Sequence, residues 1–416
     1  MHARFLAALL LAAPPALAQP TPAPVELHAF VSPTLRPDLM RQAFATFEAR
    51  HPGVTVAIEQ GGATSELQGQ YLDTVLSARD STLDLFMLDV IRPAQFAAAG
   101  WIVPLDDAVG DKAKFLADYL PAYAEADQVG GKLVALPGFA DAMMLYYRKD
   151  LLDKYHQPVP TTWDQLAQVA RVVMDGEKDP QLGGVSFQGK AIEGAVCTFL
   201  LPYWSQGKSL VANGKPTFDR DAAIKSFDVW LGLIHGGVAP KNAAEVGTDD
   251  TRQEFQAGRD VFAVLWSYGW AQFQGKDSPV AGKVGVAPLP AVAGGQAVTC
   301  LGGWQWGVSA FSKHRAEAVE LARFMSSPEV GTLLAERGSL LPVFPSLYHD
   351  PAVEAAAPFL GALLPVVEGA KARPVTPRYN QVSDAVRTIT NAVLAGQTAP
   401  DEGAAEMDAR LRRALR

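Results

Sequence analysis

Leu83-Asp84-Leu85-Phe86-Met87-Leu88 is the stretch that decides the fold. It is a nearly continuous apolar run, and a parallel strand that is covered on both faces requires such a run. Upstream of it, strand-like and helix-like segments alternate: a strand over Val25–Val31, a helix over Asp38–Arg50, a strand over Val54–Glu59 and a helix over Ser65–Arg79. This alternation predicts an α/β layer architecture.

Downstream of that run the pattern continues with more helices. Strands are expected over Lys132–Pro137 and Met143–Lys149, with Gly138–Asp141 as a short flexible connection between them. Thr162 has the position of a helix N-cap. The remaining expected elements are helices over Thr162–Met174, Glu193–Tyr203, Asp221–His235, Lys313–Met325, Pro328–Glu336, Tyr379–Ala395 and Glu402–Leu415, and strands over Val261–Trp266, Val284–Pro290 and Gln305–Ser309.

The chain has 416 residues, which is too long for one hydrophobic core and fits two domains. Pro137 and Pro288–Pro290 each stand where one α/β half ends and another begins. If the chain crosses between domains at both points, the domains are discontinuous. We therefore predict an N-terminal lobe of residues 19–137 and 291–342 and a C-terminal lobe of residues 138–290 and 343–416, joined by a hinge above a cleft.

The N-terminus has the order of a secretory signal peptide. Arg4 supplies the positive charge, Phe5–Ala13 the apolar run and Ala16-Leu17-Ala18 the cleavage site, so residues 1–18 are the predicted signal. The apolar run is too short to span a bilayer. No Cys stands at the cleavage site, so we expect a free periplasmic protein without a lipid anchor.

The charge balance gives no sign of a nucleic-acid or membrane partner. Lys and Arg number 36 against 44 Asp and Glu, a net charge of −8, and no basic stripe is present. Two Cys, Cys197 and Cys300, do not make a disulfide framework. A periplasmic setting permits a bridge, but we interpret both as buried small side chains. His and Cys are too sparse for a ligand cluster, so neither a metal nor a cofactor is predicted.

Aromatic residues beside glycine indicate binding more than catalysis. The chain has no G-x-S-x-G elbow, P-loop, H-E-x-x-H or dinucleotide fingerprint. Trp266-Ser267-Tyr268-Gly269-Trp270 follows a predicted strand, and Gly302-Gly303-Trp304-Gln305-Trp306 precedes one. Ligands of α/β sheets bind beyond strand ends. A sugar would stack its C–H faces on such rings and share its hydroxyls with carboxylates, for which Asp89 and Asp141 are placed at a strand end and in the crossing segment.

Several runs resemble the extracellular solute-binding proteins of carbohydrate ABC importers, in particular the trehalose/maltose-binding branch. They are Phe86–Val90, Gln95-Phe96, Gly100–Asp107, Leu145–Leu152, Gly189-Lys190 with Glu193-Gly194 and Val196-Cys197, Lys283–Pro290 and Leu301–Trp304. The resemblance spans almost the whole chain after the signal. It implies a class II periplasmic-binding-protein fold of two α/β lobes, a monomer that captures an α-linked disaccharide and delivers it to membrane permease subunits, and no enzymatic activity.

The resemblance also implies a ligand site. Its acidic contacts fall on Asp89 and Asp141, and its aromatic and backbone contacts fall on Phe139, Trp266, Tyr268, Gly303 and Trp304. Arg378 falls near a late polar contact.

Each of these residues also has a purely structural interpretation. Asp89 could cap the next helix, Asp141 could be a hydrogen-bonding hinge residue, and Trp266 and Trp304 could be core residues. Trp306 is interpreted as packing. Glu193 has two interpretations, a ligand contact or, as is more common for such a residue, a solvated helix charge.

The chain departs from the branch at two places. The loop Ser32–Arg36 lacks a Glu, and the helix around Gln68–Tyr71 lacks an Arg pair. These changes leave open another oligosaccharide, a sugar acid or a polyol phosphate as the ligand of the same scaffold. A separate alternative, from a different class, is a secreted glycoside hydrolase, which would need two carboxyl groups at catalytic spacing.

Overall fold

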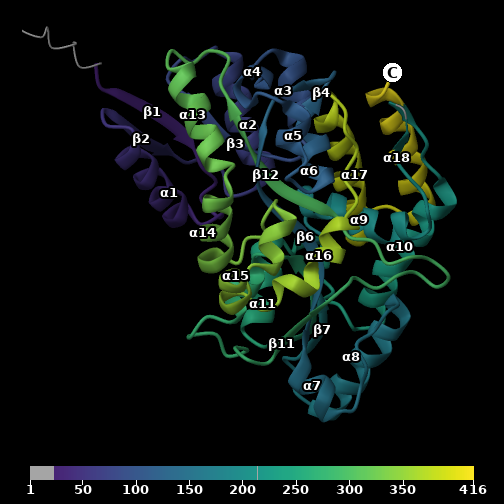
Figure 1. Cartoon of the computed structure of the whole chain (residues 1–416). Coiled ribbons are helices and arrows are strands. Elements are labelled where there is room, and N and C mark those ends of the chain that lie inside the picture. The colour runs from purple at the N-terminus through teal and green to yellow at the C-terminus, as the bar shows by residue number, and fades with distance from the viewer. Residues whose placement is uncertain (1–22, 213) are drawn as a thin grey trace, which may run out of the picture.

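The first strands and helices form a parallel sheet in the predicted order. The computed structural model describes residues 23–212 and 214–416, so the predicted signal peptide lies outside the described residues. Strand β1 (Val25–Phe30) pairs in parallel with β2 (Val54–Glu59) and with β3 (Leu85–Asp89). Helices α1 (Pro37–Arg50) and α2 (Ser65–Ser77) make the crossovers. Figure 1 shows these elements, and each predicted bound lies within two residues of the observed one.

Strand β3 confirms the prediction that the apolar run Leu83–Leu88 contains a parallel strand covered on both faces. Leu85 and Met87 belong to one hydrophobic cluster, and Phe86 and Leu88 belong to another. Side chains alternate between the two faces of a strand, so each face of β3 is covered by its own core. A strand with two covered faces needs apolar residues at successive positions, as the sequence has them.

Strand β6 (Leu136–Arg148) corrects the prediction of two strands joined by a flexible connection. Its first half, up to Ala142, pairs with β12 (Leu301–Val308). Its second half pairs with β10 (Asp260–Trp266) and, on the other edge, with β11 (Val284–Ala287). Gly138 is skipped by a register shift, and a Cβ there would lie 2.7 Å from the carbonyl oxygen of Trp304. This glycine therefore permits close strand approach and does not break the strand.

Strand β12 returns late in the chain and lies between β3 and β6, antiparallel to both. Its position makes the first half of the sheet discontinuous in sequence. It begins at Leu301, so Gly302-Gly303-Trp304, expected in a loop, is part of the strand. Pairing with Asp141 and Ala140 of β6 holds the two glycines in the strand, although glycine alone disfavours a strand. The remaining strand β7 (Gly183–Ser186) pairs in parallel with β10.

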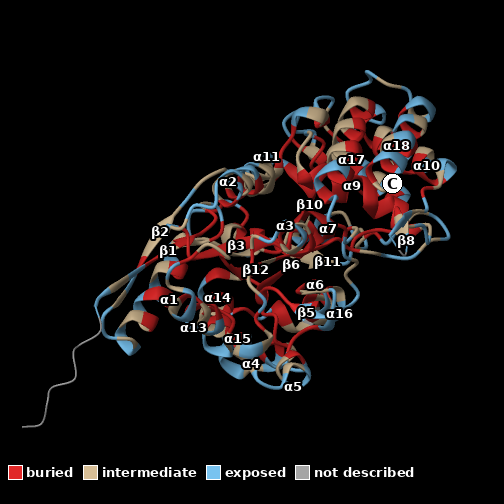
Figure 2. Ribbon diagram, turned by 90° about the horizontal axis from the view of Figure 1, so that it is seen from above, coloured by how far each residue is buried: buried red, intermediate tan, exposed pale blue. Residues whose placement is uncertain are grey.

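The C-terminal helices pack together around α9 (Glu193–Ser205), in which every residue is buried. Helices α10 (Arg220–His235) and α17 (Tyr379–Leu394) pack against it, and α18 (Pro400–Ala414) packs against these two helices. Figure 2 shows the buried residues gathered in α9 and along the sheet, with exposed residues outside. Helix α8 (Trp163–Glu177) begins as predicted, because Thr162 accepts a hydrogen bond from the amide of Gln165.

Shorter elements complete the fold, and most of them carry no strong sequence pattern. They are helices α3 (Pro93–Ala99), α4 (Asp106–Val109), α5 (Lys112–Leu116), α6 (Pro121–Ala126), α7 (Lys149–Lys154), α11 (Thr248–Gln256), α12 (Gly269–Phe273), α13 (Arg315–Met325), α14 (Pro328–Gly338), α15 (Pro351–Ala356) and α16 (Leu360–Glu368), the 3₁₀ turns η1 (Ala243–Glu245) and η2 (Pro345–His349), and the strand pairs β4 (Gln128–Val129) with β5 (Lys132–Leu133) and β8 (Val211–Ala212) with β9 (Lys215–Pro216). Among the described helices, none is both long and apolar enough to cross a bilayer.

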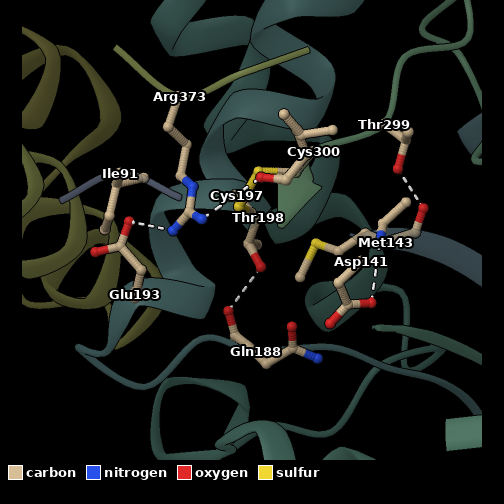
Figure 3. Close-up of a disulfide and its surroundings, with 12 residues drawn as sticks. Ile91, Asp141, Met143, Gln188, Glu193, Cys197, Thr198, Thr299, Cys300 and Arg373 are labelled. Atoms are coloured by element: carbon tan, nitrogen blue, oxygen red, sulfur yellow. Dashed lines mark hydrogen bonds and ion pairs between the residues drawn. A yellow bond between two sulfur atoms is a disulfide. The ribbon is translucent and has the colours of Figure 1, made fainter. Parts of the chain in front are cut away.

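Cys197 and Cys300 form a disulfide, which corrects the interpretation of two unpaired buried side chains (Figure 3). Their Cα atoms lie 5.8 Å apart across a sequence separation of 103 residues. Cys197 is in α9, and Cys300 directly precedes β12, where its carbonyl accepts a hydrogen bond from the amide of Met143 in β6. The bridge was missed because only the return of β12 to the base of α9 brings the two residues together.

Candidate functional site

A cavity of about 340 Å³ lies where β3, β6, β10 and β12 approach one another. This volume is within the range of about 300–1,000 Å³ that small-molecule sites occupy. Six of the eight predicted site residues line it: Asp89, Asp141, Trp266, Tyr268, Gly303 and Trp304. The other lining residues come mainly from the start of α2, the start of α9 and the start of α11.

Asp89 and Trp304 face the cavity because two neighbouring strands place them there. They are register partners, Asp89 at the last position of β3 and Trp304 opposite it in β12. Trp306, two residues further along β12, is 1% exposed and packs edge-on against Phe44, as the packing interpretation expects. The site therefore begins where the core of the sheet ends.

Asp141 lies in β6, next to the point where that strand changes partners. Its Oδ1 accepts hydrogen bonds from the amide of Ser267 at 2.9 Å, the hydroxyl of Ser267 at 2.6 Å and the amide of Ala142 at 2.9 Å. Burial raises the pKa of Asp141 to about 7, against these hydrogen bonds, and the charge of Asp89 adds to the rise. Asp141 thus connects β6 by hydrogen bonds to Ser267, which lies between the predicted aromatic contacts Trp266 and Tyr268.

Trp266 and Tyr268 flank Ser267 at the end of β10. In the sheet, β6 lies between β10 and β12, the strand that carries Trp304. Trp266 and Tyr268 are both partly exposed, and so is Trp304. Gly303 has φ of +125°, and a Cβ there would lie 2.5 Å from Tyr123 Cε1. Glycine is therefore required beside Trp304, because a side chain would collide with a buried ring.

Two predicted contacts do not line the cavity. Phe139 is 1% exposed and belongs to the larger hydrophobic cluster, so its ring is used in packing. Arg378 is exposed, and its guanidinium donates to the carbonyl of Ala414 at 3.3 Å, away from the site. The late polar residue at the cavity is instead Arg373, five positions earlier.

Arg373 is the residue that the sequence interpretation missed. Its side chain is 1% exposed and pairs with Asp89 Oδ1 at 2.9 Å and with Glu193 Oε1 at 2.8 Å. Burial opposes its charge, but the carboxylates of Asp89 and Glu193 raise its pKa above the ordinary value. Figure 3 shows Arg373 and Glu193 pointing toward each other beside the disulfide. Two arginines stand within six positions here, and no spacing pattern distinguishes the buried one.

Glu193 is buried, contrary to the interpretation as a solvated helix charge. Besides Arg373, it accepts hydrogen bonds from the hydroxyls of Tyr379 and, at 2.6 Å, of Ser383. Arg373 therefore connects the end of β3 with the start of α9, two elements from different parts of the fold.

The cavity wall is rich in carboxylates. Six acidic residues line it, Glu66, Asp89, Asp141, Glu193, Asp249 and Asp250, against two basic ones, Lys190 and Arg373. Aromatic faces and charged acceptors together suit a neutral, hydroxyl-rich ligand. The excess of negative charge disfavours an anionic one.

Comparison with known proteins identifies the family. The family description "Bacterial extracellular solute-binding protein" matches residues 33–332. The chain belongs to this family. A relative named "Probable ABC transporter-binding protein" from Deinococcus radiodurans is 36% identical over 373 residues, 88% of each chain. A "Mannitol-binding protein" from Pseudomonas aeruginosa is 25% identical over 400 residues, 88% of this solute-binding protein and 87% of its own length.

A solved structure confirms the fold class predicted for this solute-binding protein. The maltose-bound T. maritima protein MalE3 superposes with a TM-score of 0.88 at 32% identity, covering 94% of this chain and 99% of its own. The protein therefore has the two-lobed α/β fold of periplasmic sugar-binding proteins. It is a binding protein and not an enzyme, so the alternative of a secreted glycoside hydrolase is excluded.

Proposed function

We propose that this protein captures an α-linked disaccharide of the trehalose or maltose type in the periplasm and delivers it, as a monomer, to the permease of an ABC importer. The observation that carries the proposal is one cavity lined by Trp266, Tyr268 and Trp304 together with Asp89 and Asp141. Aromatic faces and carboxylates are the two groups that a sugar requires. The maltose-bound relative supports an α-linked disaccharide as the ligand class.

Within this proposal the site residues divide their roles by chemistry. The rings of Trp266, Tyr268 and Trp304 stack on the sugar's C–H faces, and Gly303 exposes backbone. Asp141 accepts a ligand hydroxyl through Oδ2, because its protein hydrogen bonds fall on Oδ1. Asp89 accepts a hydroxyl in addition to the hydrogen bonds from Ser65 and Arg373. Arg373 holds Asp89 in place from below the cavity.

Capture is proposed to work by closure of the two predicted lobes. Trp304 and Asp89 belong to residues 19–137 and 291–342, and Trp266 and Tyr268 belong to residues 138–290 and 343–416. A ligand that touches both sets binds the closed form more tightly and shifts the population toward it. Residues 1–18 are proposed to direct export, which would leave a free periplasmic protein without a lipid anchor.

A polyol is the second candidate ligand. The relative named as a mannitol-binding protein favours it, and an open-chain polyol offers the same hydroxyls without a ring to stack. The acidic wall makes a sugar acid or a polyol phosphate a poor fit, because six carboxylates face two cations.

The test is a thermal-shift and calorimetry panel of trehalose, maltose, maltotriose, mannitol and glucuronate on wild type and two variants. Binding to the folded state alone raises its unfolding temperature. We expect trehalose or maltose to give the largest rise in unfolding temperature. Trp304→Ala should weaken binding of that sugar tenfold or more, which is about 1.4 kcal/mol of binding free energy. Trp101→Ala is the matched control, because Trp101 is equally half-buried but lies off the cavity. An unchanged affinity in Trp304→Ala would refute the site, and a response to mannitol alone would select the polyol.

A further inference from the structure

Helix α9 begins at the cavity without a cap of its own. Its N-cap residue is Ile192, which has no side-chain acceptor, and the first helical residues line the cavity. The first N–H groups of a helix have no partner inside the helix. Because every residue of α9 is buried, an unsatisfied amide at this end would carry a desolvation cost.

Glu66 supplies the missing cap from another part of the chain. The amide of Glu193, the first residue of α9, donates to Glu66 Oε1. Glu66 lies in the first turn of α2, which packs against β1 and β3, whereas α9 packs with α10 and α17. The two residues are 127 positions apart in sequence, and both line the cavity. Glu66 belongs to the predicted N-terminal lobe and Glu193 to the predicted C-terminal lobe, so the cap joins the two predicted lobes.

The second oxygen of Glu66 is left free at the cavity. Glu66 lines the cavity, and its Oε2 is buried with no hydrogen-bond partner among the described residues. A buried carboxylate oxygen without a partner is costly, and a ligand hydroxyl at the cavity would satisfy it. Burial and the nearby charge of Glu193 raise the pKa of Glu66, in agreement with its incomplete set of partners.

We propose that Glu66 couples ligand capture to lobe closure, with Oε1 capping α9 across the cleft and Oε2 accepting a hydroxyl hydrogen bond from the ligand. This inference rests on the proposed function. When the lobes separate, the cap is lost and water takes its place. A hydroxyl on Oε2 fixes the carboxylate in the capping orientation, so the ligand stabilises a contact that exists only in the closed form.

Two substitutions of Glu66 distinguish the roles of its two carboxylate oxygens. Glu66→Ala removes both, so we expect a more open ligand-free protein and about tenfold weaker binding of the sugar that the panel selects. Glu66→Gln keeps a carbonyl oxygen that can cap α9 but presents an amide donor to the cavity. We expect Gln at this position to restore the wild-type radius of gyration without ligand but not the affinity.

Asp219→Ala is the matched control. Asp219 caps α10 through the amide of Ala222 at 3.0 Å, within one packed group of helices and off the cavity. Its loss should lower the unfolding temperature and leave both lobe separation and affinity unchanged.

The readouts are small-angle scattering with and without saturating trehalose, maltose or mannitol, and calorimetric affinity. If Glu66→Ala matches Asp219→Ala in both, the inference is wrong and the proposed function stands. If wild type binds no sugar or polyol, the proposed function fails. The ligand-free scattering of Glu66→Ala then still tests the cap, and an unchanged radius of gyration refutes it.

Discussion

The base of the cavity and its two side walls hold carboxylates in opposite ways. At the base, Asp89 and Glu193 share the buried guanidinium of Arg373. On the walls, Asp141 is held by the neutral donors of Ser267 and Ala142, and Glu66 by one backbone amide. A carboxylate paired with a cation is fixed by the protein, whereas one held by neutral donors retains capacity for a ligand. Among the proposed ligand contacts, Asp89 is therefore the carboxylate that the protein holds most firmly, and Asp141 and Glu66 retain more capacity for a ligand.

Removing the cation at the base should have the largest effect. Arg373→Ala leaves Asp89 and Glu193 buried without their charge partner, so we expect a loss of about 3–5 kcal/mol in the free energy of unfolding. Urea unfolding measures it. Arg373→Lys should recover only part of the loss, because an ammonium cannot form the two-pronged contact that a guanidinium makes. A change below about 1 kcal/mol would mean that the base is not held by this ion pair.

The disulfide tests whether the base is also held covalently. We expect the double variant Cys197→Ala, Cys300→Ala to lose about 2–4 kcal/mol of stability, since the bridge closes a long loop in the unfolded chain. Urea unfolding with and without a thiol reductant is the measurement. The reductant should destabilise wild type and leave the double variant unchanged. Equal stability of the two proteins under oxidising conditions would show that the bridge adds nothing.

We expect the smallest effect on stability from Asp141 in the cavity wall. The pKa of Asp141 is raised from 3.8 to about 7, so the folded state holds a proton that the unfolded state has lost in this range. Its contribution to stability is fully present below pH 4 and is lost as the pH rises to about 7. Asp141→Asn should flatten that decline, as seen in unfolding midpoints across the range.

Asp260→Asn sharpens the same comparison. Burial also raises the pKa of Asp260 to about 7, but Asp260 lies off the cavity. Both substitutions should flatten the stability profile. Ligand affinity should rise a few-fold through pH 7 in wild type, as Asp141 becomes a charged acceptor, and only Asp141→Asn should remove that rise. Identical binding profiles for the two variants would exclude Asp141 as a contact.

The fold was predictable where one segment carries its own signal. The alternation from Val25 to Leu88 predicts the first three strands and two helices, because periodicity depends on the neighbouring residues alone. Gly138 and Gly302-Gly303 misled the interpretation, since the strands they occupy are held by partners on both edges. A local pattern carries no information about such partners.

The site residues were likewise predictable only where a local sequence signal marks them. Four predicted residues lie at or near strand ends or crossings, and the sheet brings them to one cavity: Asp89, Asp141, Trp266 and Trp304. Arg373 and Glu66 come from a loop and a helix start, whose positions depend on packing between distant segments. Short-range sequence patterns give little indication of such residues.

Strand β6 makes the two lobes inseparable as building blocks. One continuous strand gives its first half to β12 and its second half to β10 and β11. An excised lobe would either lose half of a shared strand or carry an unpaired edge that invites aggregation. Recombination between relatives could therefore exchange loops around the cavity freely, but exchange of a whole lobe would require a breakpoint inside a hydrogen-bonded ladder. New ligand preferences in this scaffold should arise by substitution at the cavity wall and not by shuffling of halves.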